Sequence, residues 1–532
     1  MKIINKMMSS SQAYRRLLAL VGLVTTLILY IPAAAQGTPQ SATASVPAAT
    51  VRTVEEMVQA DLAQPTPPPA FIPFRPTMDN SKYAAGKAAA KAAQGAAQRS
   101  APPSTAPLAP PTLRDINCDG VDQGTAGNLF PPDTHGAVGA TQFVQIVNSQ
   151  IVVWDKPPDV GSCPIQLMSA SLAAFFGYFN QTLFDPRVLY DPVFNRWVVA
   201  AEAFPESATV QLQFVAVSLT SDATGGFFIY NFNARDLSGG GSAFWDFPQI
   251  GMDEDAIIVT GNVFNPGFAG ARAWFLPKHR MYNGLGFGFC FFSGGAFNLG
   301  TIAPPLVRDQ NPATVLAIAP DAANFLSITK FAATSRVCPL VLATNNIPVA
   351  AYGIPPNAPQ PGTAQVLDTS DNRFANTSTQ VGNALWQTHT TNDFGVAAPR
   401  FYKIDTDMNT IDQTGNFFAT ATSFDFNPSI VANGSNDVFV TWSVTDVANG
   451  THASVLFGGK QDTDPSISGG FVFTSPTALT GNFDPNFNAQ RWGDYSAVTV
   501  DPADPTRSWG VNEGVNATGS GWVTRFFNMG IP

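Results

Sequence analysis

The chain has 532 residues with 28 basic and 38 acidic side chains, which gives a formal net charge of −10. A chain this acidic, with no dense cluster of Lys or Arg, lacks the electropositive surface that nucleic-acid binding requires, so we exclude that class of partner. Only 12% of the residues are charged, while Gly, Pro and Phe are abundant. This composition favours short strands joined by turns.

The first 35 residues have the pattern of a secretory signal peptide, with a basic start, an apolar run at residues 17–31 and three alanines at 33–35 for cleavage. The apolar run has about 15 residues, fewer than the roughly 20 of a membrane-spanning helix, and an uncleaved anchor is the alternative. We therefore expect a secreted or extracellular protein, periplasmic or cell-surface locations included, with no membrane span after cleavage. The basic residues of the start are Lys2, Lys6, Arg15 and Arg16.

Residues 36–111 are rich in Ala, Pro, Thr, Ser and Gln. Such a composition buries too little apolar surface to offset the entropy of ordering, which predicts a linker packed poorly against the rest of the chain. One amphipathic helix is expected from Thr53, where apolar residues have helical spacing. The alanine run at residues 81–98 favours helix but offers no apolar face for docking. A propeptide is the alternative interpretation of the whole region.

The four cysteines are even in number in a chain expected to be exported, which indicates disulfides with three possible connectivities. The spacing favours Cys118 with Cys163 and Cys290 with Cys338, because each bond then joins residues that are near in sequence. The first pair begins inside Asp115-Ile-Asn117-Cys-Asp119-Gly, where oxygen ligands alternate before a glycine, as in the first half of a calcium loop. An ordinary Asx-rich turn is the alternative to a calcium site.

From residue 112 onward, one phrase recurs at intervals of about 50 to 67 residues: an Asp-, Pro- or Asn-rich turn, an apolar run, a second turn and another apolar run. Dividing about 420 residues among seven copies gives roughly 60 each, enough for four strands and their loops. We therefore predict an all-β fold, a seven-bladed β-propeller over residues 112–532, rather than two sandwiches in series. The copies begin near Pro131, Phe184, Asp246, Pro312, Asn372, Phe424 and Arg491.

Several of these phrases, above all PPDTHGAVG, DPRVLYDPVFNRWVVA and RWGDYSAVTVDPADP, resemble those of a family of secreted, mostly bacterial β-propeller proteins that often carry a sialidase-like label. The resemblance covers about residues 127–529 and implies the fold, but it brings no established reaction. In the first copy this family commonly has Asn and Asp where the chain has His135 and Ala137.

In a propeller, the turns that enter the innermost strands meet around the central funnel, so polar residues in these turns are the candidate ligand-binding residues. Asp-Pro and Asn-Pro turns also cap strands through hydrogen bonds to the backbone, and Arg–Asp pairs tie neighbouring blades together, which is the structural alternative. The candidates are Asp133, His135, Asp185, Arg187, Gln249, Asp253, Asn427, Arg491, Asp494, Tyr495 and Glu513.

These candidates predict a binding or interaction module for a glycan or an extracellular protein. The alternative is a sialidase-like glycoside hydrolase, which needs two carboxylates on either side of a sugar bond. Asp133, Asp185, Asp494 and Glu513 are the candidates for such a pair. The repeated S-x-D-x-G-x-T-W boxes of sialidases do not occur in the sequence, and no motif for serine or zinc chemistry is present. A close carboxylate pair with a perturbed pKa would favour the enzyme.

Overall fold

The computed structural model describes residues 38–63, 71–95, 110–157, 161–238, 242–308, 314–318, 325–333, 338 and 342–531. The expected signal peptide lies outside these residues. The described chain is mostly β-strand, with a few short helices. None of the helices in the described ranges is long and apolar enough to cross a membrane.

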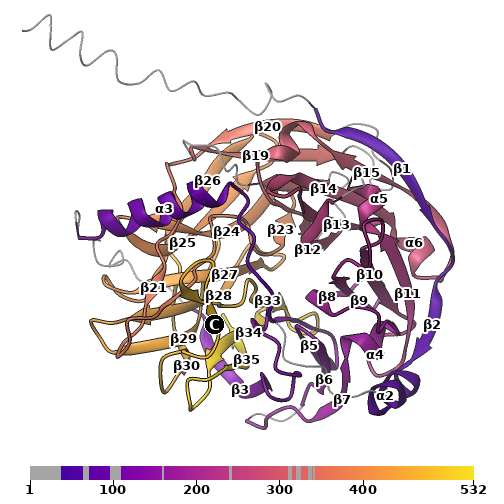
Figure 1. The fold of residues 1–532 in the computed structure, drawn as a ribbon, viewed down its shortest axis with the longest axis horizontal. Coiled ribbons are helices and arrows are strands. Elements are labelled where there is room, and N and C mark those ends of the chain that lie inside the picture. Colours follow the sequence, from indigo (N-terminus) through magenta and orange to yellow (C-terminus); the bar gives the residue numbers. More distant parts are fainter. Residues whose placement is uncertain are drawn as a thin grey trace, which may run out of the picture.

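Antiparallel sheets stand side by side around a common centre, and the chain passes from one to the next in sequence order (Figure 1). The first three begin with β4, β8 and β12 near the centre and end with β7, β11 and β15 at the outside. Their strands are β4 (His135–Val138), β5 (Gln142–Val147), β6 (Gln150–Asp155), β7 (Gln166–Ser171), β8 (Leu183–Asp191), β9 (Arg196–Ala203), β10 (Leu212–Ser218), β11 (Gly226–Asn233), β12 (Phe244–Met252), β13 (Ala256–Phe264), β14 (Phe268–Pro277) and β15 (Phe287–Ser293).

The following sheets continue the circle. Strand β17 (Pro305–Val307) pairs in parallel with both β12 and β23, so that two neighbouring sheets share one hydrogen-bonded ladder. A small sheet of β21 (Ala358–Pro359), β22 (Val366–Leu367), β31 (Phe483–Asp484) and β32 (Ala489–Gln490) lies beside the circle. The remaining strands are β16 (Ile302–Ala303), β18 (Thr314–Ile318), β19 (Ser327–Ala333), β20 (Leu342–Pro348), β23 (Ser378–Val381), β24 (Ala384–Asp393), β25 (Val396–Asp405), β26 (Thr410–Asn416), β27 (Phe424–Ala432), β28 (Val438–Asp446), β29 (Thr451–Lys460), β30 (Ser468–Thr474), β33 (Ala497–Val500), β34 (Arg507–Val515) and β35 (Trp522–Gly530).

The sheet formed by the last strands of the chain also contains a strand that precedes the first sheet in the sequence. Strand β3 (Thr112–Asp122) pairs antiparallel with β35, in the sheet order β3-β35-β34-β33. Residues 115–120, where the sequence suggests a calcium loop or an Asx-rich turn, lie within this strand, and calcium binding there stays a prediction. Their polar side chains pair with arginines: Arg525 binds Asn117 (2.7 Å) and Asp119, and Arg507 lies 3.5 Å from Asp115.

The expectation that residues 36–111 form a poorly packed linker is wrong for the described parts of this range. Strand β1 (Gln40–Val46) pairs with β15, and β2 (Thr50–Thr53) pairs with β11, so both extend sheets at the outer rim (Figure 1). The amphipathic helix expected from Thr53 is present as α2 (Val54–Leu62), started by a capping box between Thr53 and Glu56. The propeptide alternative stays a prediction.

The alanine run is helical, as α3 (Asn80–Ala93), but it is docked, with Tyr83 and Ala90 buried. The chain before α3 crosses the middle of the circle (Figure 1). Composition alone missed this because two aromatic residues, Phe74 and Tyr83, supply most of the apolar contact. The other helices are α4 (Leu172–Phe176), α5 (Ala234–Leu237), α6 (Lys278–Met281) and the 3-10 helix η3 (Gly295–Leu299).

The hydrophobic core lies between neighbouring sheets, where faces rich in Val, Ile, Phe and Trp pack together. Both expected disulfides are confirmed: Cys118 is bonded to Cys163, and Cys290 to Cys338.

Candidate functional site

Three innermost strands, β8, β12 and β27, enter the circle through the same irregular turn. In each, a residue with positive φ precedes a proline, and the pairing with the next strand shifts register at that point. A bulge of this kind bends the strand and re-aims the neighbouring side chains. Left-handed backbone is rare for a bulky residue such as Phe247, and such outliers concentrate at functional sites. The three turns are Asp185-Pro186, Phe247-Pro248 and Asn427-Pro428.

These turns place a set of buried polar side chains around the centre, which we call the funnel site. Its members come from the turn before β4, from the irregular starts of strands β8 and β12, from strand β9, and from the loop before β33. They are Asp133, Asp185, Arg187, Glu202, Asp246, Arg491, Asp494 and Tyr495.

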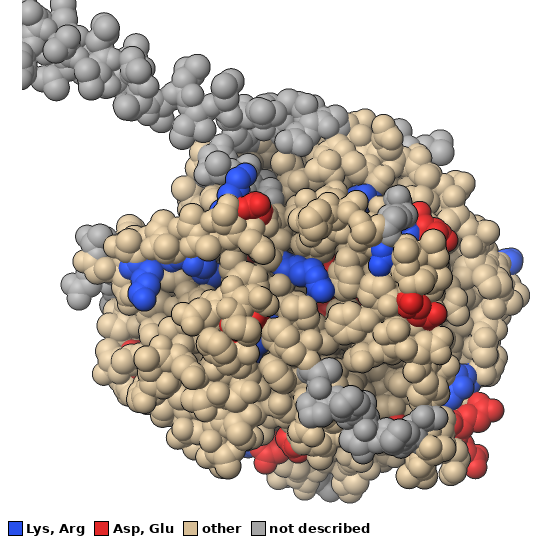
Figure 2. Space-filling view, viewed as in Figure 1, with Lys and Arg blue, Asp and Glu red and all other residues tan. Residues whose placement is uncertain are grey.

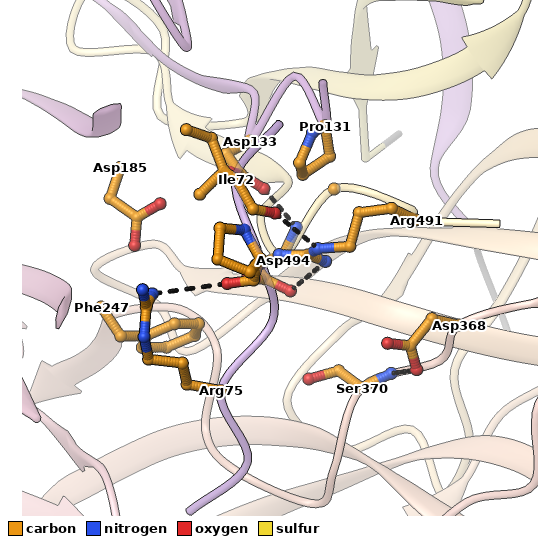
Figure 3. Close-up of polar contacts among 12 residues, drawn as sticks. Ile72, Arg75, Pro131, Asp133, Asp185, Phe247, Asp368, Ser370, Arg491 and Asp494 are labelled. Carbon is orange, nitrogen blue, oxygen red and sulfur yellow. Dashed lines mark hydrogen bonds and ion pairs between the residues drawn. The ribbon is translucent and has the colours of Figure 1, made fainter. Parts of the chain in front are cut away.

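An ion pair forms one side of the funnel site (Figure 3). Both terminal nitrogens of Arg491 contact Asp494, at 2.9 and 2.6 Å. The backbone N–H of Asp494 donates to Asp133 at 2.6 Å, so the loop before β33 is joined to the turn before β4. Both side chains of the ion pair are buried, so removing one partner would leave an uncompensated charge.

Asp133 is completely buried and has a φ of 44°. Its carboxylate also accepts a hydrogen bond from the Asn148 amide at 2.6 Å, and Asn148 in turn accepts one from the Asp185 N–H at 2.8 Å. Burial, together with the nearby charge of Asp494, raises the pKa of Asp133 to about 6. A chain of hydrogen bonds therefore connects the ion pair to Asp185.

Asp185, Glu202 and Asp246 form a buried carboxylate triad. One oxygen from each lies within 4.8 Å of the others, which is close enough to hold one cation between them. Burial raises the pKa of all three, and each is raised further by charge on neighbouring carboxylates. Three carboxylates at this separation cannot all be ionised in a site removed from water.

The three carboxylates have different partners. Asp185 accepts a hydrogen bond of 2.6 Å from the Tyr495 hydroxyl, and Asp246 forms an ion pair of 3.2 Å with Arg75. Glu202 accepts one backbone hydrogen bond, from Phe247 at 3.1 Å, and its second oxygen, Oε2, has no hydrogen-bond partner among the residues that the structure describes. Glu202 is thus the member with a free oxygen, and its pKa is raised well above the ordinary value by burial.

Arg187 lies beside the triad without an ion pair to it. Its guanidinium stacks 3.3 Å from the centre of the Tyr495 ring and donates hydrogen bonds to Pro248, Ala375 and Asn376. Tyr495 is completely buried, and burial followed by the charge of Asp185 raises its pKa. The phenol therefore stays protonated and serves as a donor that orients the Asp185 carboxylate.

The structure brings most of the predicted residues together. Gln249 donates to the same Ala375 carbonyl as Arg187, at 2.7 Å, and Asn427 donates to the Gly493 carbonyl at 2.5 Å. Glu513 accepts the Gly493 N–H at 2.7 Å, and burial raises its pKa. His135 accepts the Val188 N–H at 3.4 Å, and burial followed by the charge of Arg187 lowers its pKa.

Asp253 does not join the funnel site. It follows the other end of β12 and accepts the N–H groups of Asp255 and Ala256, so it caps the turn into β13. Sequence reasoning missed Glu202, Asp246 and Arg75. The signal for Glu202 is a lone acidic residue in the apolar run RWVVAAEAF, and the signal for Asp246 is its place at the start of a recurring phrase.

The funnel site is covered by residues 71–79. On this face most of the visible surface is uncharged, and several basic side chains lie in a band from the position of α3 toward the centre (Figure 2). Arg75 in this segment is one-quarter exposed, whereas its partner Asp246 is buried. The carboxylates are thus closed off from solvent as the chain stands.

Comparisons with known proteins give a weak structural likeness. No family model matches the chain, and no curated protein matches its sequence. An exo-β-1,3-galactanase from Phanerochaete chrysosporium has a TM-score of 0.32 at 11% identity, covering 80% of this chain and 96% of that one. An α-L-arabinanase from Penicillium chrysogenum has 0.33 at 8%, covering 79% and 98%. A protein of unknown function from Dyadobacter fermentans has 0.37 at 9%, covering 65% and 94%. At these scores the likeness establishes neither a family nor an activity.

Proposed function

We propose that the circle of sheets is a seven-bladed β-propeller of an exported protein. The support for this count is the pairing order, in which β4, β8, β12, β16, β23, β27 and β33 each start a group of antiparallel strands. Every group has four strands once β3 is counted with β33, β34 and β35, and β1, β2 and β17 are counted as additions. The two disulfides fit an oxidising compartment.

We propose further that the funnel site hydrolyses glycosidic bonds. The observation that carries this proposal is the carboxylate triad: three buried acids from two neighbouring sheets, with oxygens within 4.8 Å and unlike hydrogen-bond partners. Glycoside hydrolysis needs one carboxylic acid that is protonated and one carboxylate that is not, and different environments produce that difference.

The partners assign the roles. Glu202, which has a free oxygen and a pKa raised by burial, is the general acid that donates its proton to the oxygen of the leaving sugar. Asp185 is the carboxylate that attacks the anomeric carbon: burial raises its pKa, and the hydrogen bond from the Tyr495 hydroxyl acts against that rise and favours its ionised form. Glu202 then acts as the base that takes a proton from the incoming water. The short separation favours this two-step route, in which the anomeric configuration is retained.

The alternative, a binding module for a glycan or surface protein, has less support at the funnel. Sugar binding by stacking needs accessible aromatic rings, yet Phe247, Trp492 and Tyr495 are all buried. Arg491 is already paired with Asp494, and Arg373 with Asp371 at 2.7 Å, so neither arginine offers an unpaired charge to an anionic ligand. The paired arginines and buried rings therefore support the structure of the funnel site and are not available to bind a partner.

The test is hydrolysis of a panel of 4-methylumbelliferyl glycosides by the chain carrying Arg75→Ala, which takes the guanidinium away from Asp246. We expect activity near pH 5 and a loss of at least about 100-fold in kcat when Glu202→Gln is added. Glu206→Gln, an exposed glutamate that follows the same strand, is the matched control and should keep full activity. Equal hydrolysis by the Glu202→Gln variant would contradict the proposal, as would the absence of hydrolysis in a chain cut so that residues 71–79 leave the site.

A further inference from the structure

Residues 71–95, which cover the funnel site and include α3, have an unusual relation to the sheets, and we call this segment the strap. Residues 71–79 cross the face of the circle and lead into α3, and their backbone pairs with the propeller backbone at an isolated bridge between Phe71 and Phe130. The sheets close on themselves without it, because β3, which completes the last sheet, begins at Thr112. The strap thus lies over a closed circle of sheets, which we call the ring, and contributes no strand to it.

Arg75 is the strap residue that reaches the carboxylates. Its guanidinium contacts Asp246 at 3.2 Å and stacks 3.9 Å from the centre of the Phe244 ring. Asp246 thus has an ion pair to a strap residue, and within the described ranges neither Asp185 nor Glu202 has one. A cation held against Asp246 also favours the ionised form of that carboxylate.

The strap backbone is held by the arginines of the funnel. Arg373 donates to the Arg75 carbonyl at 2.7 Å, and Arg491 donates to the Ile72 carbonyl at 3.3 Å. Thr77 donates its N–H and its hydroxyl to Asp371, both at 3.0 Å. Side chains of the propeller thus hydrogen-bond the strap backbone, as side chains of a binding groove do with an extended peptide.

The outer end of the strap is fastened by α3. The Tyr83 hydroxyl donates to Asp368 at 3.0 Å, and the Lys87 ammonium donates to Thr369 at 2.8 Å and to the Ser370 carbonyl at 2.6 Å. The rings of Phe74 and Tyr83 pack against Phe487 at 5.6 and 5.4 Å. The strap therefore has a docked anchor at one end and Arg75 over the acids at the other.

We propose that the strap is an intramolecular inhibitor of the funnel site. Its backbone occupies the face along which an extended substrate would lie, and Arg75 fills the entrance to the carboxylate triad. The inhibitory role rests on the proposed hydrolase function, whereas the docking of the strap as a separable ligand does not. The chain as folded is accordingly latent, and removal of the strap exposes the acids while leaving every sheet intact.

The experiment cuts the folded full-length chain on both sides of the strap. One recognition sequence for a site-specific protease is inserted within residues 64–70 and another within residues 96–109, and the protein is purified before and after cutting. We expect residues 71–95 to separate from the ring on size exclusion, and hydrolysis of 4-methylumbelliferyl glycosides to rise at least about tenfold. The synthetic peptide of residues 71–95, added back, should inhibit that hydrolysis and bind in calorimetry.

Peptide variants sharpen the assignment. The peptide with Arg75→Ala should bind and inhibit at least about tenfold more weakly, while Lys91→Ala, an exposed lysine on α3, should behave like the natural peptide. A strap that stays bound after both cuts, or hydrolysis that is equal before and after its release, overturns the inhibitor proposal. Release and rebinding of the peptide with no hydrolysis of any glycoside instead overturns the hydrolase, and with it the inhibitory role.

Discussion

Two pieces of the same Ala- and Pro-rich sequence dock in different ways. The rim segment, residues 40–62, adds β1 and β2 to existing sheets and buries Met57, on the inner face of α2, in the core. The strap adds no strand to the ladders and is held by side chains directed at its backbone and at Arg75. Ladder pairing makes the rim segment part of the scaffold, whereas the strap resembles a ligand that happens to be covalently attached. We expect substitutions in the two pieces to have separable effects.

The largest expected loss of stability comes from breaking the buried Arg491–Asp494 ion pair, which lies beneath the strap. Asp494→Asn leaves Arg491 buried without a full counter-charge and should lower the free energy of unfolding by about 3 to 5 kcal/mol. Asp504→Asn is the control, since Asp504 pairs with Arg507 at the same spacing but at the surface, and should cost about 0 to 1 kcal/mol. Urea unfolding measures both. Equal losses would show that burial of the first pair contributes nothing.

The rim segment should respond to loss of its buried anchor. Met57→Ala removes a completely buried side chain and should destabilise the protein by about 2 to 5 kcal/mol. Because Met57 packs far along the outer rim, the variant should leave the protease resistance of the strap unchanged. The distinction between the two segments would be wrong if Met57→Ala made the strap sensitive to protease without lowering the midpoint of unfolding.

The pH dependence of stability should reveal the buried acid at the centre. The pKa of Asp133 is about 6 in the folded protein, above its usual value near 4, so the folded state holds this proton at a pH where the unfolded chain has lost it. Its contribution to stability is therefore greatest in acid and is lost as the pH rises through 6. Buried His135 and His389, whose pKa values are lowered, act in the opposite direction.

The difference between wild type and Asp133→Asn separates these contributions. From pH 7 to pH 5 the wild type should gain about 1 to 2 kcal/mol relative to the variant in urea unfolding. A constant difference across this range would mean that Asp133 is ionised throughout.

The smallest effect should be confined to the strap. Tyr83→Phe removes the hydrogen bond to Asp368 and should weaken strap docking by about 1 kcal/mol, because the ring contacts remain. Faster proteolysis within residues 71–95, with an unchanged midpoint of unfolding for the ring, is the expected result. If Tyr83→Phe lowered the midpoint of unfolding as much as Met57→Ala does, the strap would be part of the cooperatively folded propeller.

Much of the fold could be predicted because its signal is local. The recurring turns mark the entries to β4, β8, β12 and β27, and polar residues in those turns do meet, as Asp133, Asp185 and Asp494 show. Asp253 was misplaced because a turn at the far end of β12 has the same composition as the turn at its start. Turn chemistry identifies a turn but not the end of the sheet on which it lies.

The rest depended on distant contacts. Glu202 lies in a second strand, where alternation predicts only a buried face, and its partners come from other parts of the chain. Arg75 lies in a segment whose mean composition argues against docking, yet a few directed contacts hold it, such as Thr77 to Asp371 across 294 residues. Averages over a window cannot register contacts made by single side chains at that separation.

The pairing of β3 with β35 has a consequence for how the protein is made. The Ile116 N–H donates to the Asn528 side chain, 412 residues later, so the last sheet waits for nearly the whole chain to emerge. A chain synthesised from its amino end exposes one unpaired sheet edge until β35 is made, and such edges favour aggregation. The circle of sheets is thus closed only when β35 pairs with β3, and a nascent chain without β35 remains an open arc.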